Sequence, residues 1–208
     1  YGQLSDSRIS EYKKIYGNII VDHTHAFFQK PLKGIDTLYS CRKFWGVSDG
    51  AYLSTDASLT ENKTVDYSAE RMKHILGRYD GMELRQMSKL TQNLLKAVDY
   101  DRAKKKREEN YRILGELLPS ESIFNQTVPE GPFAYPYFHA DGMKLRRYLA
   151  EKKIFVPTYW KNIIENSETK SLEYTWAANI LPLPCDQRYS VEDMKYMASV
   201  VRECEERI

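Results

Sequence analysis

One short apolar run, which ends abruptly in a carboxylate, constrains the fold of this chain most. Residues 18–21 read Asn-Ile-Ile-Val and are followed directly by Asp22. Such a run is typical of a buried strand, and open α/β sheets bind ligands beyond the carboxyl ends of their strands. Further along the chain, Lys43 lies between candidate strands at 37–39 and 51–54. The sequence therefore predicts an amine and a carboxylate near one edge of a sheet.

Lys43 and Asp22 are the two kinds of side chain that pyridoxal phosphate (PLP) requires. A lysine amine forms a Schiff base with the aldehyde of this cofactor, and a carboxylate pairs with its pyridinium nitrogen. Taken alone, Lys43 is better explained as an ordinary surface lysine, and Asp22 can be a carboxylate in a helix cap or a turn after the strand. PLP chemistry is thus one hypothesis among these.

Several segments resemble the DegT/DnrJ/StrS sugar aminotransferases, which are fold-type I PLP enzymes. Asp22–Phe27 resembles that family's Asp-Ala-Ala-Gln-type motif, Ser40–Lys43 its Schiff-base segment, and Ser48–Ala51 its acidic-Gly-Gly-like turn. Phe155–Trp160 and Ile180–Arg188 extend the resemblance over nearly the whole chain. It implies that the chain corresponds to the C-terminal portion of such an enzyme.

The resemblance gives roles to four residues. Lys43 would hold PLP as a Schiff base and move a proton between the substrate and the cofactor, for which its amine must be neutral. Asp22 would keep the pyridine nitrogen protonated, His25 would contact the 3′-oxygen, and Ser40 would bind the phosphate. Packing explains His25 nearly as well. His23 and His25 form a His-x-His pair, but no Cys or acidic ligand cluster accompanies them, so we expect no metal site.

Two positions depart from the family's pattern for binding the phosphate. Many relatives place a serine five residues before the lysine, where this chain has Leu38, and the asparagine that they supply across the dimer falls near Leu84. Both departures favour a rival function, namely a non-catalytic homologue that serves as a sugar-binding or interaction module. A small-molecule binder unrelated to PLP is a third possibility.

Composition excludes several classes of function. The chain has 208 residues, of which 42% are hydrophobic and 29% charged, and its net charge is +2, which gives no electrostatic case for binding nucleic acid or an anionic membrane. No apolar run approaches the roughly 20 residues of a membrane span. The three cysteines are widely spaced, which indicates no disulfide framework and fits the cytoplasm.

The order of candidate elements predicts an α/β fold with two domains. The resemblance implies that residues 1–118 are the C-terminal part of a PLP-binding large domain, a mixed sheet with flanking helices, and that residues 119–208 form a small C-terminal α/β domain. We expect residues 104–109 to be a solvated helix surface and residues 154–156 to be a strand. Apolar periodicity predicts helices over 66–79 and, with Met87, Leu90, Leu94 and Val98 on one face, over 87–98, besides helices near 5–16, 111–118, 141–149 and 190–201.

The resemblance also implies an activity. It is that of a PLP-dependent aminotransferase, which passes an amino group, with glutamate as the expected donor, to a ketosugar that we expect to be linked to a nucleotide. Fold-type I sites form at a dimer interface, so a homodimer is expected. Relatives in which histidine replaces the lysine are dehydratases, and Lys43 argues against that group.

Overall fold

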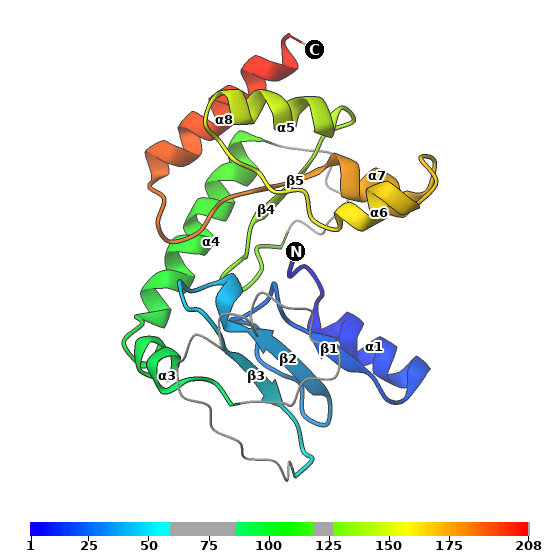
Figure 1. The fold of residues 1–208 in the computed structure, drawn as a ribbon, viewed down its shortest axis with the longest axis vertical. Helices are drawn as coiled ribbons and strands as arrows, with labels where there is room; N and C mark the ends of the chain where they lie inside the picture. Colours follow the sequence, from blue (N-terminus) through cyan, green and yellow to red (C-terminus); the bar gives the residue numbers. More distant parts are fainter. Residues whose placement is uncertain (59–85, 119–126, 208) are drawn as a thin grey trace. The chain divides into compact units, whose positions relative to one another are not determined.

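Residues 1–58, 86–118 and 127–207 are described by a computed structural model of the chain (Figure 1). They form two compact units, Gly2–Tyr100 and Asp101–Ile208, the second of which includes Tyr1. The predicted boundary lies at 118/119, whereas the structure divides the chain ahead of Asp101, because a long helix in between packs into the C-terminal core. The predicted helix over 66–79 and Leu84 lie outside the described residues.

The N-terminal unit contains a three-stranded sheet. Its elements are α1 (Asp6–Tyr16), β1 (Ile20–Asp22), β2 (Asp36–Ser40), the 3-10 turn η1 (Cys41–Lys43), β3 (Ala51–Ser54) and α3 (Lys89–Lys96). The strand order is β1-β2-β3; β1 and β2 run parallel, and β2 and β3 run antiparallel. This confirms the predicted strands at 37–39 and 51–54 and their antiparallel pairing.

The beginning and the end of α1 follow from local chemistry. The side chain of Ser5 accepts a hydrogen bond from the Arg8 amide and caps the first turn. Gly17, at a φ of 72°, ends the helix in the left-handed region that favours glycine. Ile9 is buried against Val21 and Ile35, so α1 covers one face of the sheet.

Among the described strand residues of this sheet, burial is confined to the face that α1 covers. Val21, Thr37 and Tyr39 are buried on it, whereas Ile20 and Leu38 on the other face are exposed. The predicted strand ending in Asp22 is confirmed, but its prediction as a buried strand is wrong, since β1 alternates between exposed and buried residues.

The predicted apolar face of α3 is also wrong. Leu90 and Leu94 are 49% and 47% exposed, whereas Thr91 and Leu95 are buried. The helix is rotated from the expected orientation because hydroxyl groups in its first turn bind a buried carboxylate, which is described below.

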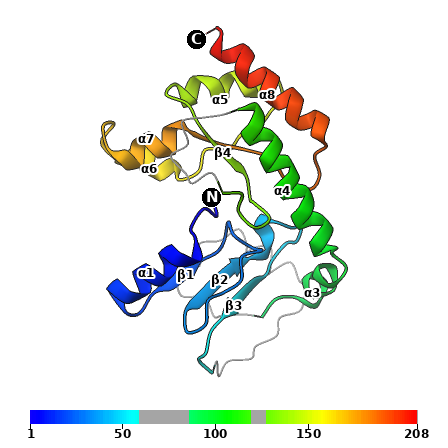
Figure 2. The ribbon, with the colours of Figure 1, turned by 180° about the vertical axis from the view of Figure 1, so that it is seen from behind.

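The C-terminal unit is built around a two-stranded antiparallel sheet (Figures 1 and 2). Helix α5 packs against α7, α8 and β5. Residues from α4, α5, α8 and both strands share one apolar core. The elements are α4 (Tyr100–Leu117), β4 (Tyr135–Phe138), α5 (Gly142–Glu151), α6 (Lys161–Asn166), α7 (Leu172–Asn179), β5 (Ile180–Leu183) and α8 (Val191–Glu205).

Two further expectations for this unit have different outcomes. Helix α8 begins as predicted, because Ser190 and Asp193 form a capping box. The predicted strand over 154–156 is not formed. The Ile154 amide donates instead to the carbonyl of Leu149 at 2.8 Å, and Lys153 takes a left-handed φ of 63°, so this backbone ends α5.

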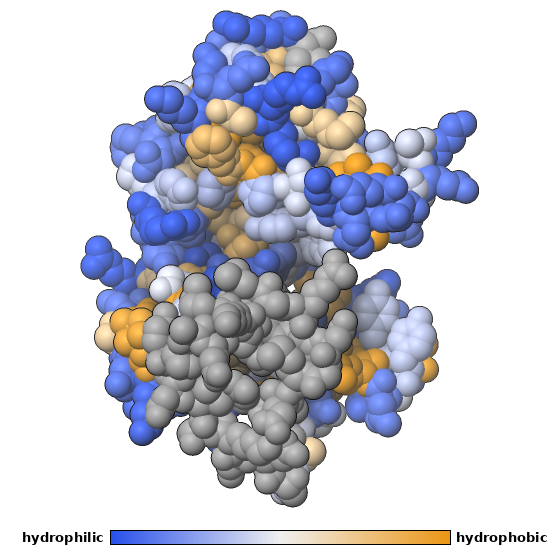
Figure 3. All heavy atoms as spheres, viewed as in Figure 1, coloured by the Kyte–Doolittle hydropathy of each residue, from blue (hydrophilic) through white to orange (hydrophobic). Residues whose placement is uncertain are grey.

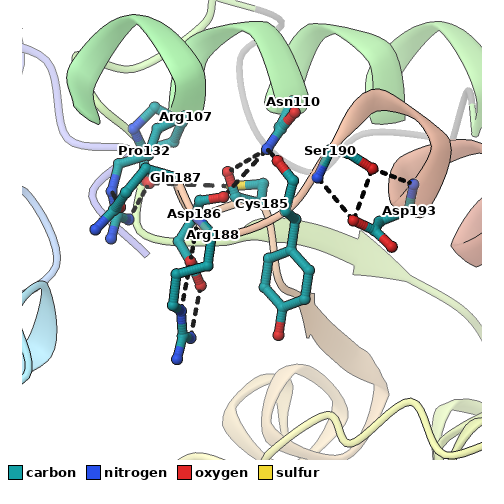
Figure 4. A network of polar contacts seen from close by, with 10 residues as sticks. Arg107, Asn110, Pro132, Cys185, Asp186, Gln187, Arg188, Ser190 and Asp193 are labelled. Carbon is teal, nitrogen blue, oxygen red and sulfur yellow. Dashed lines mark hydrogen bonds and ion pairs between the residues drawn. The ribbon is translucent and has the colours of Figure 1, made fainter. Parts of the chain in front are cut away.

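Helix α4 corrects the expectation that residues 104–109 are a solvated surface. Lys106 pairs with Glu109, as an exposed face would, but Arg107 is buried. Its guanidinium donates to the Gln187 side chain at 2.7 Å and to the Pro132 carbonyl at 2.9 Å (Figure 4). Burial lowers the pKa of Arg107, although the nearby Cys185 and Asp186 oppose this.

Apolar side chains reach the surface of both units among more numerous polar ones (Figure 3). Of the helices formed by the described residues, none combines the length and the apolarity that crossing a membrane requires. Cys41, Cys185 and Cys204 are all buried free thiols.

Candidate functional site

The segments that carry Asp22 and Lys43 leave the sheet at the same edge. Asp22 is the last residue of β1 and is paired with Leu38 of the parallel strand β2. Strand β2 ends at Ser40, and η1, which contains Lys43, follows at once. Because alternate residues of a strand share a face and paired residues lie side by side, Asp22, Leu38 and Ser40 lie on the exposed face of the sheet.

A cluster of aromatic rings joins the two segments. Phe27, which follows the Asp22–His25 turn, lies with its ring centroid 5.4 Å from that of Phe44 and 5.6 Å from that of Trp45. Trp45 in turn contacts Tyr100 at 5.2 Å. Because Phe44 and Trp45 directly follow Lys43, these contacts hold the lysine turn beside the turn after β1.

The residues of this aromatic cluster were not among the predicted site residues. The sequence does contain a signal for this cluster, because a pair of aromatic residues follows closely after both His25 and Lys43. Scattered aromatic residues in a tyrosine-rich chain obscure such a signal.

His25 lies within electrostatic reach of both predicted attachment residues. Burial lowers the pKa of His25 to about 4; the positive charge of Lys43 acts in the same direction, and the carboxylate of Asp22 acts against it. His25 is therefore neutral at pH 7. Lys43 and Asp22 are themselves exposed, and Oδ1 of Asp22 accepts a hydrogen bond from the Thr24 amide at 2.8 Å.

The histidine next to Asp22 has a different environment. His23 is buried, with its ring edge-to-face with Tyr39 at 5.3 Å, and burial lowers its pKa. Among the residues that the structure describes, no group of three or more His, Cys, Asp and Glu side chains could hold a metal ion. His23 thus belongs to the core of the unit.

His25 makes the stability of the chain depend on pH. Its pKa in the folded state, about 4, is below its value of about 6.5 in an unfolded chain. Between these values the unfolded state binds more protons, so the free energy of unfolding should rise as the pH is raised from 4 to 6.5. The measurement is urea unfolding over this pH range for the wild type and His25→Asn, followed by Trp45 fluorescence in a background in which Trp160 and Trp176 are phenylalanine. The variant should show a shallower dependence, and an equal slope would contradict the assignment.

The side chains at this edge suit PLP chemically. They comprise an amine at Lys43, a carboxylate at Asp22, a neutral imidazole at His25 and a hydroxyl at Ser40. Leu38, which is 41% exposed on the same face, offers no hydrogen bond to a phosphate. Phosphate binding within β2 would therefore depend on Ser40.

Comparison with known proteins shows the fold. No family model and no curated protein matches the chain. Solved structures do match, among them a DegT DnrJ EryC1 StrS aminotransferase from Brucella abortus (15% identity, TM-score 0.60, covering 96% of this chain and 61% of that one). Another is PseC from Helicobacter pylori, an aminotransferase involved in pseudoaminic acid biosynthesis (12% identity, TM-score 0.59, covering 100% of this chain and 65% of that one). A third is the sugar aminotransferase CalS13 from Micromonospora echinospora (12% identity, TM-score 0.61, covering 97% of this chain and 64% of that one).

These matches cover nearly all of this chain but less than two thirds of each of these solved proteins. The chain therefore has the fold of a part of these aminotransferases. At such low identity the likeness is one of fold.

Proposed function

We propose that this chain is part of a PLP-dependent aminotransferase that passes an amino group, with glutamate as the donor, to a ketosugar linked to a nucleotide. The observation that supports the proposal is that Asp22 ends β1 and Lys43 lies in η1 directly after β2, at the carboxyl ends of two parallel strands, and that both charges act on the pKa of His25. The fold, shared with part of solved sugar aminotransferases, supports the same conclusion. We further propose that the first unit belongs to the cofactor-binding domain and that the working form is a cytoplasmic homodimer.

Each site residue has a distinct task in this proposal. Lys43 would hold PLP through its amine, Asp22 would pair with the ring nitrogen, and Ser40 would bind the phosphate. When bound, PLP supplies an electron sink for the developing carbanion and carries the amino group between the two substrates. Nζ of Lys43 would accept a proton from the substrate carbon and pass it to the cofactor.

His25 contributes through its neutral state. A protonated imidazole beside Lys43 would add a second positive charge at the site. Burial keeps the His25 ring uncharged at pH 7, so it can donate or accept a hydrogen bond at the cofactor oxygen without that charge.

The test is whether PLP reacts selectively with Lys43. The chain is mixed with excess PLP, its visible absorbance is recorded, and the adduct is fixed with borohydride and located by peptide mapping. We expect the pyridoxyl group mainly on Lys43, with Lys30 and Lys33, which are also exposed, as internal references. Labelling of Lys43 no greater than that of these two lysines would contradict the proposal.

A non-catalytic homologue is the second candidate, and Leu38 favours it. An exposed leucine occupies the position of the expected phosphate-binding serine. This candidate predicts that a nucleotide sugar binds the chain, for example in calorimetry, while PLP shows no preference for Lys43.

A further inference from the structure

We infer that Asp49 is a positioning residue for Lys43, because it ties the loop that contains the lysine to the N-terminus of α3. The inference rests on the proposed function for what Lys43 does. The contacts that form the tie are independent of that proposal.

Residues 41–50 form a loop that is closed at its base. Ser40 and Ala51 are the last paired residues of β2 and β3, and the Cys41 amide donates to the Gly50 carbonyl at 3.1 Å. Inside the loop, the amides of Phe44 and Trp45 both donate to the carbonyl of Cys41, at 3.2 and 3.0 Å. Lys43 lies within this turn, so its backbone position follows that of the loop base.

Asp49 is buried at that base and is bound by groups of α3. The exposed fraction of Asp49 is 7%. The Ser88 amide donates to Oδ2 at 2.9 Å and the Ser88 hydroxyl to Oδ1 at 2.8 Å, and the Thr91 hydroxyl also donates to Oδ1. Ser88 is the N-cap of α3, where a negative charge is favoured by the helix dipole and charge-assisted hydrogen bonds are strong.

A second contact joins the same two pieces of chain. Gly50 has a φ of 111°, which favours glycine, and a Cβ built on it would lie 2.9 Å from the terminal methyl carbon of Met87. The Met87 side chain thus packs directly on the loop base, next to the Ser88 contact. Met87, Ser88 and Thr91 together fix both Asp49 and Gly50.

The contacts of Asp49 affect the position of the Lys43 amine. Lys43 is exposed and lies in a short turn, so its position depends on the base of that turn. Without the Asp49 carboxylate, the buried donor groups of Ser88 and Thr91 would lose this acceptor. The loop base would then shift or become more mobile. A displacement of about 1 Å at a reacting group can lower a rate by about 10²-fold. We therefore expect Asp49 to control how well the Lys43 amine meets the cofactor.

The experiment compares Asp49→Ala and the milder Asp49→Asn with the wild type. In the borohydride mapping described above, Asp49→Ala should lower the labelling of Lys43, relative to Lys30 and Lys33, about tenfold or more. Asp49→Asn, which keeps an oxygen that can accept from the Ser88 amide, should lie between. Ser5→Ala is the matched control, because it removes the N-cap of α1 in the same unit and none of the contacts described here between loop 41–50 and α3. It should leave the labelling unchanged.

A second measurement does not depend on PLP. Hydrogen exchange of the amides of Cys41, Phe44 and Trp45 should be about tenfold faster in Asp49→Ala than in Ser5→Ala. Unchanged exchange at these amides would contradict the claim that Asp49 fixes the loop base. Unchanged labelling of Lys43 despite faster exchange would contradict the claim that Asp49 positions Lys43. If wild-type Lys43 is not labelled selectively, the proposed function fails, while the exchange data still decide whether Asp49 fixes the loop.

Discussion

On the proposed function, replacing Lys43 by alanine should abolish the selective PLP adduct and lower the rate of transamination by roughly 10²–10⁴-fold. The expected size is that of removing a positioned general acid–base group, and loss of the covalent attachment adds to it. Lys43→Arg should be as inactive, because a guanidinium keeps the positive charge but remains protonated. The measurements are the visible absorbance with PLP and the rate of amino transfer from glutamate to a nucleotide-linked ketosugar.

The matched control for Lys43→Ala is Lys33→Ala, which also removes one exposed lysine of the N-terminal unit. It should leave both the adduct and the rate unchanged. If Lys43→Ala keeps more than about a tenth of the rate, Lys43 is not the proton-transfer group. In that case the aminotransferase proposal would need another lysine.

Local chemistry in the sequence predicted much of the frame around the site. Strands β2 and β3 were predictable because Thr37–Tyr39 and Ala51–Ser54 contain residues that favour strands and flank a short connection ending at Gly50. The start of α8 was predictable from a serine followed three residues later by an aspartate. The carboxyl end of β1 was predictable because the apolar run stops abruptly at Asp22.

The errors arose where a distant contact overrides a local pattern. Leu90 and Leu94 have helical spacing and were expected to face inward, but Asp49 binds Ser88 and Thr91 instead and turns the helix. Asp49 and Ser88 are 39 residues apart, and neither stands in a pattern that indicates the other. Arg107 is a similar case, since a charged run gives no sign that one member is buried against Gln187.

The residue types of the candidate site come from the sequence and stay a prediction, whereas the contacts that support these residues were not predicted from the sequence. The sequence indicates an amine, a carboxylate and a histidine, because their chemistry is distinctive. The aromatic contacts of Phe27 and the hydrogen bonds of Asp49 depend on tertiary packing. Such contacts join residues that are far apart in the sequence, so no local motif indicates them. Selectivity of PLP for Lys43 is therefore a test of the packing as well as of the lysine.

Asn110→Ala should destabilise the C-terminal unit by about 3 kcal/mol. Asn110 is fully buried on α4, and its amide nitrogen lies 3.3 Å from the carbonyl oxygen of Cys185 and 3.1 Å from those of Asp186 and Tyr189 (Figure 4). These carbonyls belong to the segment between β5 and α8. Alanine would remove the donor from three acceptors and leave a small cavity, each of which costs stability.

Urea unfolding of the C-terminal unit, followed by the fluorescence of Trp160 and Trp176 in a Trp45→Phe background, measures this loss. Asn166→Ala is the matched control, because Asn166 makes one exposed hydrogen bond to the carbonyl of Asn162 at 2.7 Å. That change should cost no more than about 0.5 kcal/mol. Equal losses for the two variants would show that the Asn110 amide does not hold the 185–189 segment on α4. A loss confined to Asn110→Ala would show that a single buried amide fixes the path from β5 to α8.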